Sequence, residues 1–556
     1  MKQHSEWKMP YEPDPKYGKR VAYMCMEFGI DQALKLYSGG LGYLAGSHMR
    51  SAYQLKQNMI GIGMLWRYGY YDQQQDMYGN MIADFRRKYY TFLQDTGIIV
   101  DVYIKKYAVK VKALYLAPEI FGTVPMYFLT TDIPENDGLS RSIMYRLYHP
   151  NEATRVAQSI VLGIGGAKVV EALGGVDIFH INEAHALPVA FHLLNKYHLN
   201  LEKVKKHLVF TTHTPEKAGN SVMHIHLLDD MGFFDQIQLD DVRRLTGMYN
   251  DMFEYTPAAL RLSGIANGVS QLHGEVARKM WKDYPNTCKI IAITNAQDEV
   301  YWTDSKLRLA LDTNDDEALV NRKLELKKRL FKTVANQAGD LFDPKVLTIV
   351  WARRFAGYKR PDLILRDFER FQKLINNHKH PVQIIWAGKP FPEDQNGVNQ
   401  FNYIIGQTYK APRMSILTGY ELELSAILKM GADIWLNTPR RPQEASGTSG
   451  MTAAMNGAIN LSINDGWIPE FARHGRNSFI VPEANEFAPH HEQDHHDHHH
   501  IFELLEHEIV PMYYEHKEQW LEIMKNSMRE VVPQFDSKRM ADEYYRLMYT
   551  NDSILR

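Results

Sequence analysis

Residues 346–360 read VLTIVWARRFAGYKR, a strongly apolar run that leads directly into a cluster of cations. Such a run, bounded by polar residues, is typical of a buried strand. Runs of the same kind recur at residues 382–389, 413–419, 432–439 and 458–463. Helical patterns separate them, and apolar strands that alternate with helices indicate a parallel sheet covered on both faces. We therefore predict a doubly wound α/β domain over residues 344–556.

The N-terminal half has the same organisation. VAYMCMEFGI at residues 21–30 predicts a strand, and GGLGYLAGSHMRSAYQLKQN at residues 39–58 predicts a glycine-rich loop followed by a helix. Further strands are predicted at residues 176–185, 207–215 and 289–296. These patterns predict a first α/β domain over residues 1–298 and a helical connection over residues 299–343. Ligands of open α/β sheets bind outside the carboxyl ends of the strands, so we expect a site in a cleft between the two domains.

Composition excludes several classes of protein. The chain has 556 residues, of which 45% are hydrophobic and 23% charged, and its net charge is −2. Such values are typical of a folded protein with no general attraction to nucleic acid. Two cysteines in this length argue against a disulfide framework, and no apolar run is long enough to span a membrane. We expect a cytoplasmic protein with no nucleic-acid or membrane partner.

The cations that follow the strand at residues 346–352 predict an anion site. They are Arg353, Arg354, Lys359 and Arg360. Cations at the start of a helix oppose its dipole, whereas a bound anion would gain from both the dipole and the charges. We favour phosphate binding over a solvated helix start.

EASGTSGMT, at residues 444–452, is a second candidate site. It offers small residues, the hydroxyls of Ser446, Thr448 and Ser449, and the carboxylate of Glu444, which together are the polar lining that a sugar needs. The signal from Gly39, Gly40 and Gly42 is weaker, because glycines before a helix are as often a tight turn as a ligand cradle. His213 and His185 follow apolar strands, where a structural histidine is the commoner interpretation.

Two further patterns are given no functional role. PHHEQDHHDHHH at residues 489–500 holds seven of the 24 histidines, but without ordered ligand spacing it predicts a solvated loop and no metal site. The glycines of residues 163–166 lie within a helical pattern, where they indicate close packing.

Several motifs together resemble those of the α-glucan (glycogen, starch, maltodextrin) phosphorylases in their short bacterial form. They include MEFGIDQALKLYSGGLGYLAGSHMRSA, HINEAHA, FTTHTPEKAGN, ARRFAGYKR and NTPRRPQEASGTSGM, and they cover nearly the whole chain in family order. The resemblance implies a GT-B fold, in which two Rossmann-like domains face each other across a central cleft. It also implies retaining transfer of glucosyl units between an α-1,4-glucan and phosphate, and it allows a homodimer.

The resemblance assigns roles to individual residues. Arg354 and Lys359 match the cations on the substrate phosphate, and His213 matches the histidine beside the transferred glucose. Residues that match sugar- or phosphate-binding positions are Gly39, Gly40, Leu41, Gly42, Asn295, Glu444, Ser446 and Gly447. Arg353 and Thr448 match positions near the phosphate of the family's cofactor, pyridoxal phosphate.

Thr452 departs from the family pattern. Phosphorylases carry pyridoxal phosphate on a lysine at this position, and a hydroxyl cannot form an imine. Covalent attachment is therefore not expected, and noncovalent binding stays open. Three functions remain: a phosphorylase-type transferase, which we favour; a transferase that uses a nucleotide-sugar without pyridoxal phosphate, as glycogen synthases do; and a catalytically silent glucan-binding homologue.

Overall fold

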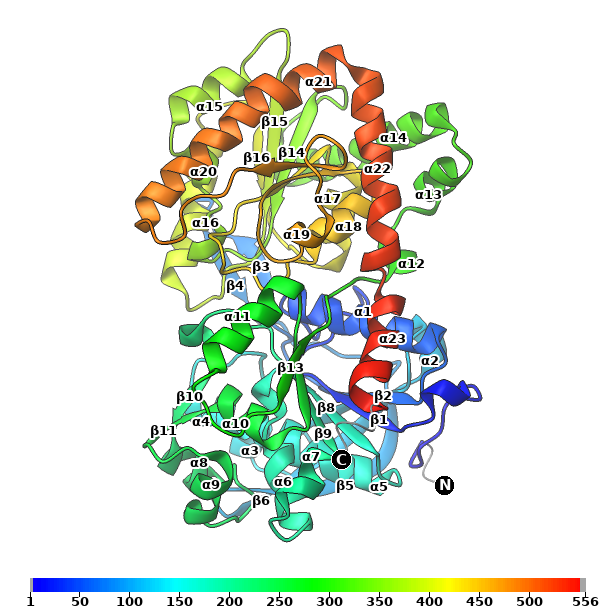
Figure 1. Ribbon diagram of the computed structural model, residues 1–556, viewed down its shortest axis with the longest axis vertical. Coiled ribbons are helices and arrows are strands. Elements are labelled where there is room, and N and C mark those ends of the chain that lie inside the picture. Colours follow the sequence, from blue (N-terminus) through cyan, green and yellow to red (C-terminus); the bar gives the residue numbers. More distant parts are fainter. Residues whose placement is uncertain (1–3, 551–556) are drawn as a thin grey trace. The chain divides into compact units, whose positions relative to one another are not determined.

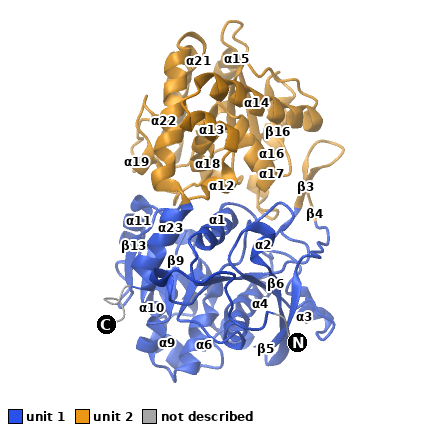
Figure 2. Cartoon of the chain, turned by 90° about the vertical axis from the view of Figure 1, so that its right-hand side faces the viewer, with its two compact units in different colours: residues 1–71, 85–295, 537–556 blue, residues 72–84, 296–536 orange. Residues whose placement is uncertain are grey.

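A computed structural model describes residues 4–550 and divides the chain into two compact units (Figures 1 and 2). Within the described residues, the first unit contains residues 4–71, 85–295 and 537–550. The second unit contains residues 72–84 and 296–536. Each unit is built around a mainly parallel sheet, which confirms an α/β protein.

The first unit has a 9-stranded sheet in the order β13-β12-β9-β8-β1-β2-β7-β6-β5. Pairing is parallel from β13 to β7, and β6 and β5 add an antiparallel edge. The chain runs outward from β1 to β2 and β7 on one side, and from β8 to β9, β12 and β13 on the other, so the strand order reverses between β1 and β8. The strands are β1 (Val21–Met24), β2 (Met59–Met64), β5 (Gln94–Ile104), β6 (Tyr107–Leu116), β7 (Met126–Thr130), β8 (Ile178–Asn182), β9 (Leu208–Thr211), β12 (Ile265–Gly268) and β13 (Lys289–Ala292).

Helices connect the parallel strands of the first unit, and a separate two-stranded ribbon joins β10 (Val222–His224) to β11 (Met252–Glu254). The glycines of residues 163–166 lie within one continuous helical stretch, as predicted. They also allow close packing, since a Cβ at Gly163 would lie 2.8 Å from the backbone nitrogen of Val189. The helices are α1 (Gly40–Gln54), α2 (Pro118–Phe121), α3 (Gly138–Ser142), α4 (Glu152–Ile160), α5 (Gly166–Ala172), α6 (Pro188–Lys196), α7 (Leu201–Lys205), α8 (Ile225–Met231), α9 (Leu239–Thr246), α10 (Tyr255–Leu262), α11 (Gln271–Trp281) and α23 (Ser537–Tyr544).

The second unit has a 6-stranded parallel sheet in the order β16-β15-β14-β17-β18-β19. This is the doubly wound order of a Rossmann-like domain, with its reversal between β14 and β17. The strands are β14 (Leu347–Ala352), β15 (Val382–Ala387), β16 (Met414–Leu417), β17 (Ile434–Asn437), β18 (Ile459–Ile463) and β19 (Ser478–Val481). Strands β14 to β18, which lie in the predicted apolar runs, are buried along their whole length, which explains why they lack the alternation of a half-exposed strand.

The helices of the second unit include the predicted connection over residues 299–343. Its main helix packs on the sheet through a cluster that includes Leu330, Val334, Leu428 and Trp435. The helices are α12 (Glu299–Trp302), α13 (Ser305–Asp312), α14 (Asp316–Ala338), α15 (Phe368–Ile375), α16 (Gln395–Thr408), α17 (Leu422–Gly431), α18 (Ser449–Met455), α19 (Ile468–Phe471), α20 (His490–Leu504), α21 (Val510–Glu515) and α22 (Lys517–Phe535). No helix among the described residues is long and apolar enough to cross a membrane.

Two segments belong to a different unit from the one that the predicted boundaries of residues 1–298, 299–343 and 344–556 give them. The hairpin of β3 (Asp72–Gln75) and β4 (Met81–Asp84) belongs to the second unit, where Gln73 donates to the Gly388 carbonyl at 2.9 Å. Residues 537–550 belong to the first unit, where Ser537 and Ser51 join hydroxyls at 2.6 Å. Both assignments depend on contacts distant in sequence, which local patterns do not reveal.

The prediction of a solvated loop over residues 489–500 is wrong. The segment is the first part of α20, and Asp494, Asp497 and His498 are buried. Arg360 donates to Asp494 at 2.8 Å and to Asp497 at 2.7 Å, and Arg440 adds a contact to Asp494 at 2.8 Å. Two aspartates among histidines therefore fix a helix to the sheet through arginines that lie far away in the sequence.

Candidate active site

The carboxyl ends of β14 and β17 form the centre of the site in the second unit. Arg353 follows β14, is 6% exposed, and donates to Asn437 at the end of β17. It also donates to the Glu444 carboxylate at 3.0 Å. Because parallel strands end at one edge of the sheet, the strand reversal brings these groups together at the place where α/β sheets bind ligands.

Lys359 completes an ion-pair cluster on Glu444. A short 3₁₀ turn at residues 357–359 brings the ammonium to the same carboxylate oxygen that Arg353 contacts. Burial opposes ionisation of Glu444, but the charges of Lys359 and Arg353 outweigh it and lower the pKa of that carboxyl. The cluster is thus one ionised carboxylate between two cations, which leaves a positive edge for an anion.

Asp465 fixes the loop that carries Glu444. This aspartate follows β18 and accepts hydrogen bonds from the backbone nitrogens of Glu444 at 2.9 Å and Gly466 at 2.8 Å. Gly466 has a φ of +63°, and a Cβ there would lie 2.3 Å from the Ser446 carbonyl oxygen, so the turn requires glycine. Burial raises the pKa of Asp465 to about 7.

This pKa predicts a pH dependence of stability. In the unfolded chain an aspartate titrates near its ordinary pKa of 3.8, so between that pH and about 7 the folded state binds more protons. Stability therefore falls as pH rises through this window, by up to about 4 kcal/mol, and changes no further above it. We expect Asp465→Asn to remove this part of the slope when urea unfolding is measured from pH 4 to pH 8. An equal fall in both proteins would contradict the assignment.

Among the buried polar atoms of the second unit that have no hydrogen-bond partner within the described residues, two lie at this edge of the sheet. They are Nε of Arg353 and the hydroxyl of Ser446, which is 3% exposed. Orphaned buried polar atoms are rare in folded proteins, and a bound ligand is one way to satisfy them. Both belong to the edge that the sequence assigns to phosphate and sugar.

The structure separates the four cations of residues 353–360 into two groups. Arg353 and Lys359 join the cluster, and exposed Arg354 contributes charge to it, since it helps to lower the pKa of Glu444. Arg360 is 1% exposed and binds α20, so its predicted place at the anion site is wrong. The expected helix start is also wrong, because α15 begins only at Phe368.

The strand reversal of the first unit positions a second set of polar groups. Glu27, three residues after β1, accepts from the backbone nitrogens of Ser38 at 2.6 Å and Gly39 at 3.2 Å, and from the Tyr148 hydroxyl at 2.6 Å. The carboxylate thereby holds the glycine-rich loop against the sheet. The nitrogen of Gly39 is thus already occupied, whereas Gly40, Leu41 and Gly42 open α1, where backbone N–H groups have no intrahelical acceptor.

His213 lies beside this reversal. Its Nε2 is 2.7 Å from Oδ1 of Asn182 at the end of β8, and the Asn182 amide nitrogen donates to Cys25 Sγ at 3.3 Å. Burial, together with nearby His273 and His185, lowers the pKa of His213 to about 3, so the ring is neutral. Nε2 therefore carries the proton, and Nδ1 keeps a lone pair that can accept from a sugar hydroxyl.

Asn295 lies on the same edge of the first unit. It follows β13, which pairs with β12. Strand β12 also pairs with β9, the strand that leads to His213. Its backbone nitrogen donates to the Val269 carbonyl at 2.9 Å, and its side-chain oxygen is buried without a partner among the described residues. The group is fixed in place and retains an unused acceptor.

Sequence reasoning missed four residues that hold these sites: Glu27, Asn182, Asn437 and Asp465. Each stands at or just after the carboxyl end of a strand beside a reversal or next to it. The sequence does carry a signal, because each is a polar residue at the end of an apolar run. Its importance becomes clear only when the strand order is known.

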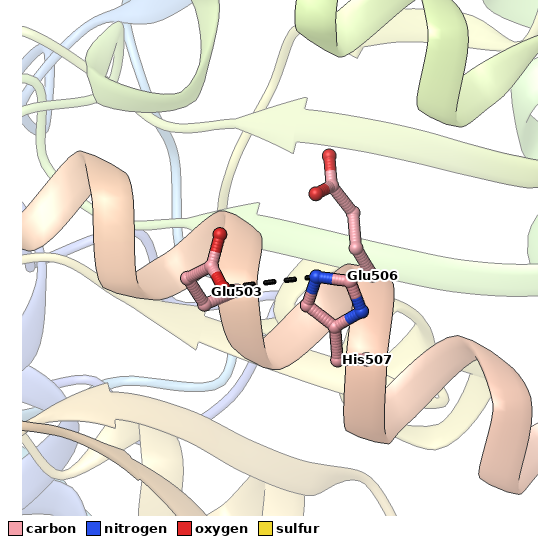
Figure 3. Close-up of side chains that lie close together, drawn as sticks. All are labelled: Glu503, Glu506 and His507. Atoms are coloured by element: carbon pink, nitrogen blue, oxygen red, sulfur yellow. Dashed lines mark ion pairs between the residues drawn. The ribbon is translucent and has the colours of Figure 1, made fainter.

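A group of acidic and histidine side chains lies elsewhere, at the end of α20 (Figure 3). Glu503, Glu506 and His507 approach one another there, and His507 is 3.7 Å from Glu503. Arg370 contacts Glu503 at 2.8 Å and Glu506 at 2.6 Å. Both carboxylates are therefore already paired with one arginine.

Comparison with known proteins finds a family model and several relatives that match this chain. A family model described as carbohydrate phosphorylase matches residues 276–503. A maltodextrin phosphorylase of Thermococcus litoralis is 32% identical, over 96% of this chain and 71% of the relative. The chain belongs to the carbohydrate phosphorylase family. A glycogen phosphorylase of Aquifex aeolicus is 31% identical, over 99% of this chain and 88% of its own length.

Another relative of this chain has no assigned function. This uncharacterised protein of Methanocaldococcus jannaschii is 47% identical over 96% of the chain and 100% of its own length. Two mainly parallel sheets are consistent with the GT-B fold of the phosphorylase family, whose members use pyridoxal phosphate.

Proposed function

We propose that this protein is an α-glucan phosphorylase, which transfers a glucosyl unit from an α-1,4-glucan to phosphate with retention. The observation that carries the proposal is the Arg353–Glu444–Lys359 cluster at the β14/β17 reversal. It joins cations suited to a phosphate with a carboxylate suited to sugar hydroxyls. The GT-B arrangement is part of the proposal, so that groups of both units act on one substrate.

The chemistry then follows from charge. Departure of the glucan oxygen needs a proton, which the attacking phosphate gives up on the same face of the sugar. The phosphate oxygen that forms the new bond concentrates negative charge on that face. Lys359 and Arg354 stabilise that charge, while Glu444 and His213 hold hydroxyl groups of the glucose. No protein nucleophile is required for retention when both events occur on one face.

Part of the family's cofactor site fits pyridoxal phosphate. Arg353 has an unused buried donor, and Thr448 stands at the start of α18, where both would hold the phosphate of the cofactor. If bound there, the cofactor would supply acid–base chemistry to the substrate phosphate through its own phosphate group. The fit fails at Thr452, which is fully buried, donates to the Ser449 carbonyl at 3.1 Å and has no amine.

The alternative donor is a nucleotide-sugar, because the same cations would suit a diphosphate. We would test this in the synthetic direction with maltotetraose as acceptor and equal concentrations of glucose 1-phosphate, UDP-glucose or ADP-glucose. The proposal expects elongation and phosphate release with glucose 1-phosphate alone. Elongation only with a nucleotide-glucose would establish the alternative, and glucan binding without transfer from any donor would indicate a silent homologue.

The glycines of α1 provide a matched pair of variants. A Cβ at Gly42 would lie 2.6 Å from Tyr37 Cβ, whereas no described atom lies within 4 Å of a Cβ at Gly40. We expect Gly42→Ala to lower the free energy of unfolding by about 1–3 kcal/mol. Gly40→Ala should not lower it, and should raise KM for phosphate because its methyl group enters the space above the helix N-terminus. Thermal unfolding and phosphate titration check both results, and an unchanged KM in Gly40→Ala would contradict this role for the loop.

A further inference from the structure

The histidines of residues 490–500 gain an ordered spacing because this stretch is the first part of α20. His496 and His500 stand four positions apart, so their side chains lie on one face of the helix, one turn apart. Their ring centroids are 4.2 Å apart. Two histidines at this spacing on a helix can bind one zinc ion together. The helix therefore supplies the ligand spacing that the sequence alone does not reveal.

Hydrogen bonds fix the tautomer of both rings. Nδ1 of His500 lies 2.8 Å from the carbonyl oxygen of His496, and Nδ1 of His496 lies 3.1 Å from Oδ1 of Asp497. Both partners are acceptors, so each Nδ1 carries the proton and each Nε2 keeps its lone pair. Metal-binding imidazoles are usually oriented in this way, by a carbonyl or a carboxylate on the nitrogen that does not bind the metal.

The carboxylate that orients His496 is itself held in place. Asp497 is 4% exposed, and its other oxygen accepts from Arg360 at 2.7 Å. Arg360 is 1% exposed and also donates to the Thr438 carbonyl at 2.9 Å. The orientation of the His496 ring is therefore set from the interior of the second unit, although the ring itself reaches the surface.

Further ligands stand next to the pair. His499 is exposed, and the centroid of its ring lies 5.1 Å from that of His500. Glu492 is exposed one turn before His496 and adds negative charge on that side. Because His496 and His500 are only partly buried, water can reach the coordination positions that the protein leaves open.

We propose that α20 binds a transition-metal dication through Nε2 of His496 and Nε2 of His500, with His499 beside them as a third imidazole. Imidazole nitrogens suit zinc, nickel and copper, whereas magnesium and calcium prefer oxygen ligands. The site shares no residue with the Arg353–Glu444–Lys359 cluster. It does not depend on the proposed function, and its test does not use the activity.

His491 and His495 provide a matched control on the same helix. They have the same spacing of four positions, and both are exposed. Within the described residues, neither ring makes a hydrogen bond that would fix its tautomer. If the oriented rings make the site, the two pairs differ in affinity. If a high density of histidines were sufficient, they would bind the metal equally well.

The test is a calorimetric titration of the full chain with zinc chloride, after purification without a histidine tag and treatment with a chelator. Magnesium stays in the buffer as a competitor. We expect one zinc ion per chain, and a higher temperature of thermal unfolding, because the ion binds the folded state. His496→Ala and His500→Ala should each weaken binding by about 10²-fold, since the second imidazole binds intramolecularly. His491→Ala/His495→Ala should leave the affinity unchanged.

Several results would overturn the proposal. They are the absence of zinc binding in the presence of magnesium, equal losses in the two pairs, and a loss only in His491→Ala/His495→Ala. Loss of binding in Glu506→Gln would also overturn it, because the ion would then lie at Glu503, Glu506 and His507 (Figure 3).

X-ray absorption of the zinc-loaded wild-type protein provides a measurement that needs no variant. We expect at least two imidazole nitrogens around the zinc. A shell of oxygen ligands alone would contradict the assignment, even if His496→Ala and His500→Ala do not fold.

Discussion

Lys359→Ala should lower the rate of glucose 1-phosphate release from a maltodextrin by about 10²–10³, the usual cost of removing one electrostatic contact to a transition state. Lys359 shares the Glu444 carboxylate with Arg353, which lies 3.0 Å from it. The carboxylate therefore keeps a counter-charge, and the loss of stability should not exceed that of one charged hydrogen bond, about 1.5–3 kcal/mol.

Steady-state kinetics and urea unfolding of the same preparation check this separation. Lys359→Arg retains a cation and should recover part of the lost rate. Arg354→Ala should show a similar loss of rate with a smaller change in stability, since its side chain is exposed. Near-normal turnover in both alanine variants would place the anion site elsewhere.

Asp433→Ala should act mainly on stability, with a loss of about 3–5 kcal/mol in the free energy of unfolding of the second unit. Asp433 and Lys327 form a buried ion pair with side chains 5% and 3% exposed. The carboxylate also accepts from the backbone nitrogen of Thr348 at 2.9 Å, which ties β17 to β14 at the amino ends of the strands. Removal of Asp433 leaves a buried ammonium without its counter-ion.

Glu369→Ala is the matched control for this prediction. It removes an ion pair with Lys373 in which both side chains are largely exposed, at 80% and 74%. Such pairs contribute about 0–1 kcal/mol. Equal losses in the two variants, measured by chemical denaturation, would contradict a structural role for the buried pair.

The sheets were predictable from the sequence because their strands are buried on both faces. The apolar runs at β14, β15, β16, β17 and β18 need no tertiary information to be recognised. Strands β12 and β19 were not predicted, since β12 ends in Asn267 and Gly268 and β19 begins with a serine. Their places in the sheets depend on pairing with neighbouring strands.

The candidate site was predictable only in part. Arg353, Lys359 and Glu444 lie together, but the pairing of both cations with one carboxylate is a long-range contact. Arg360 has the same residue type and sequence context as its neighbours, yet its guanidinium binds Asp494 and Asp497 on α20. No local pattern distinguishes a cation that binds a ligand from one that binds a distant helix.

The same limit applies to the cofactor site. Thr452 marks a lost amine within a recognisable motif. Only the structure shows that its side chain is fully buried and donates to the Ser449 carbonyl.

The most direct test of the account is the reaction of maltopentaose with inorganic phosphate after loading with pyridoxal phosphate. We expect glucose 1-phosphate to appear as its α anomer, at a rate that depends on phosphate and falls in Lys359→Ala. Failure to form glucose 1-phosphate under these conditions, by a protein that still elongates maltopentaose from a nucleotide-glucose, would contradict the assignment of phosphorolysis.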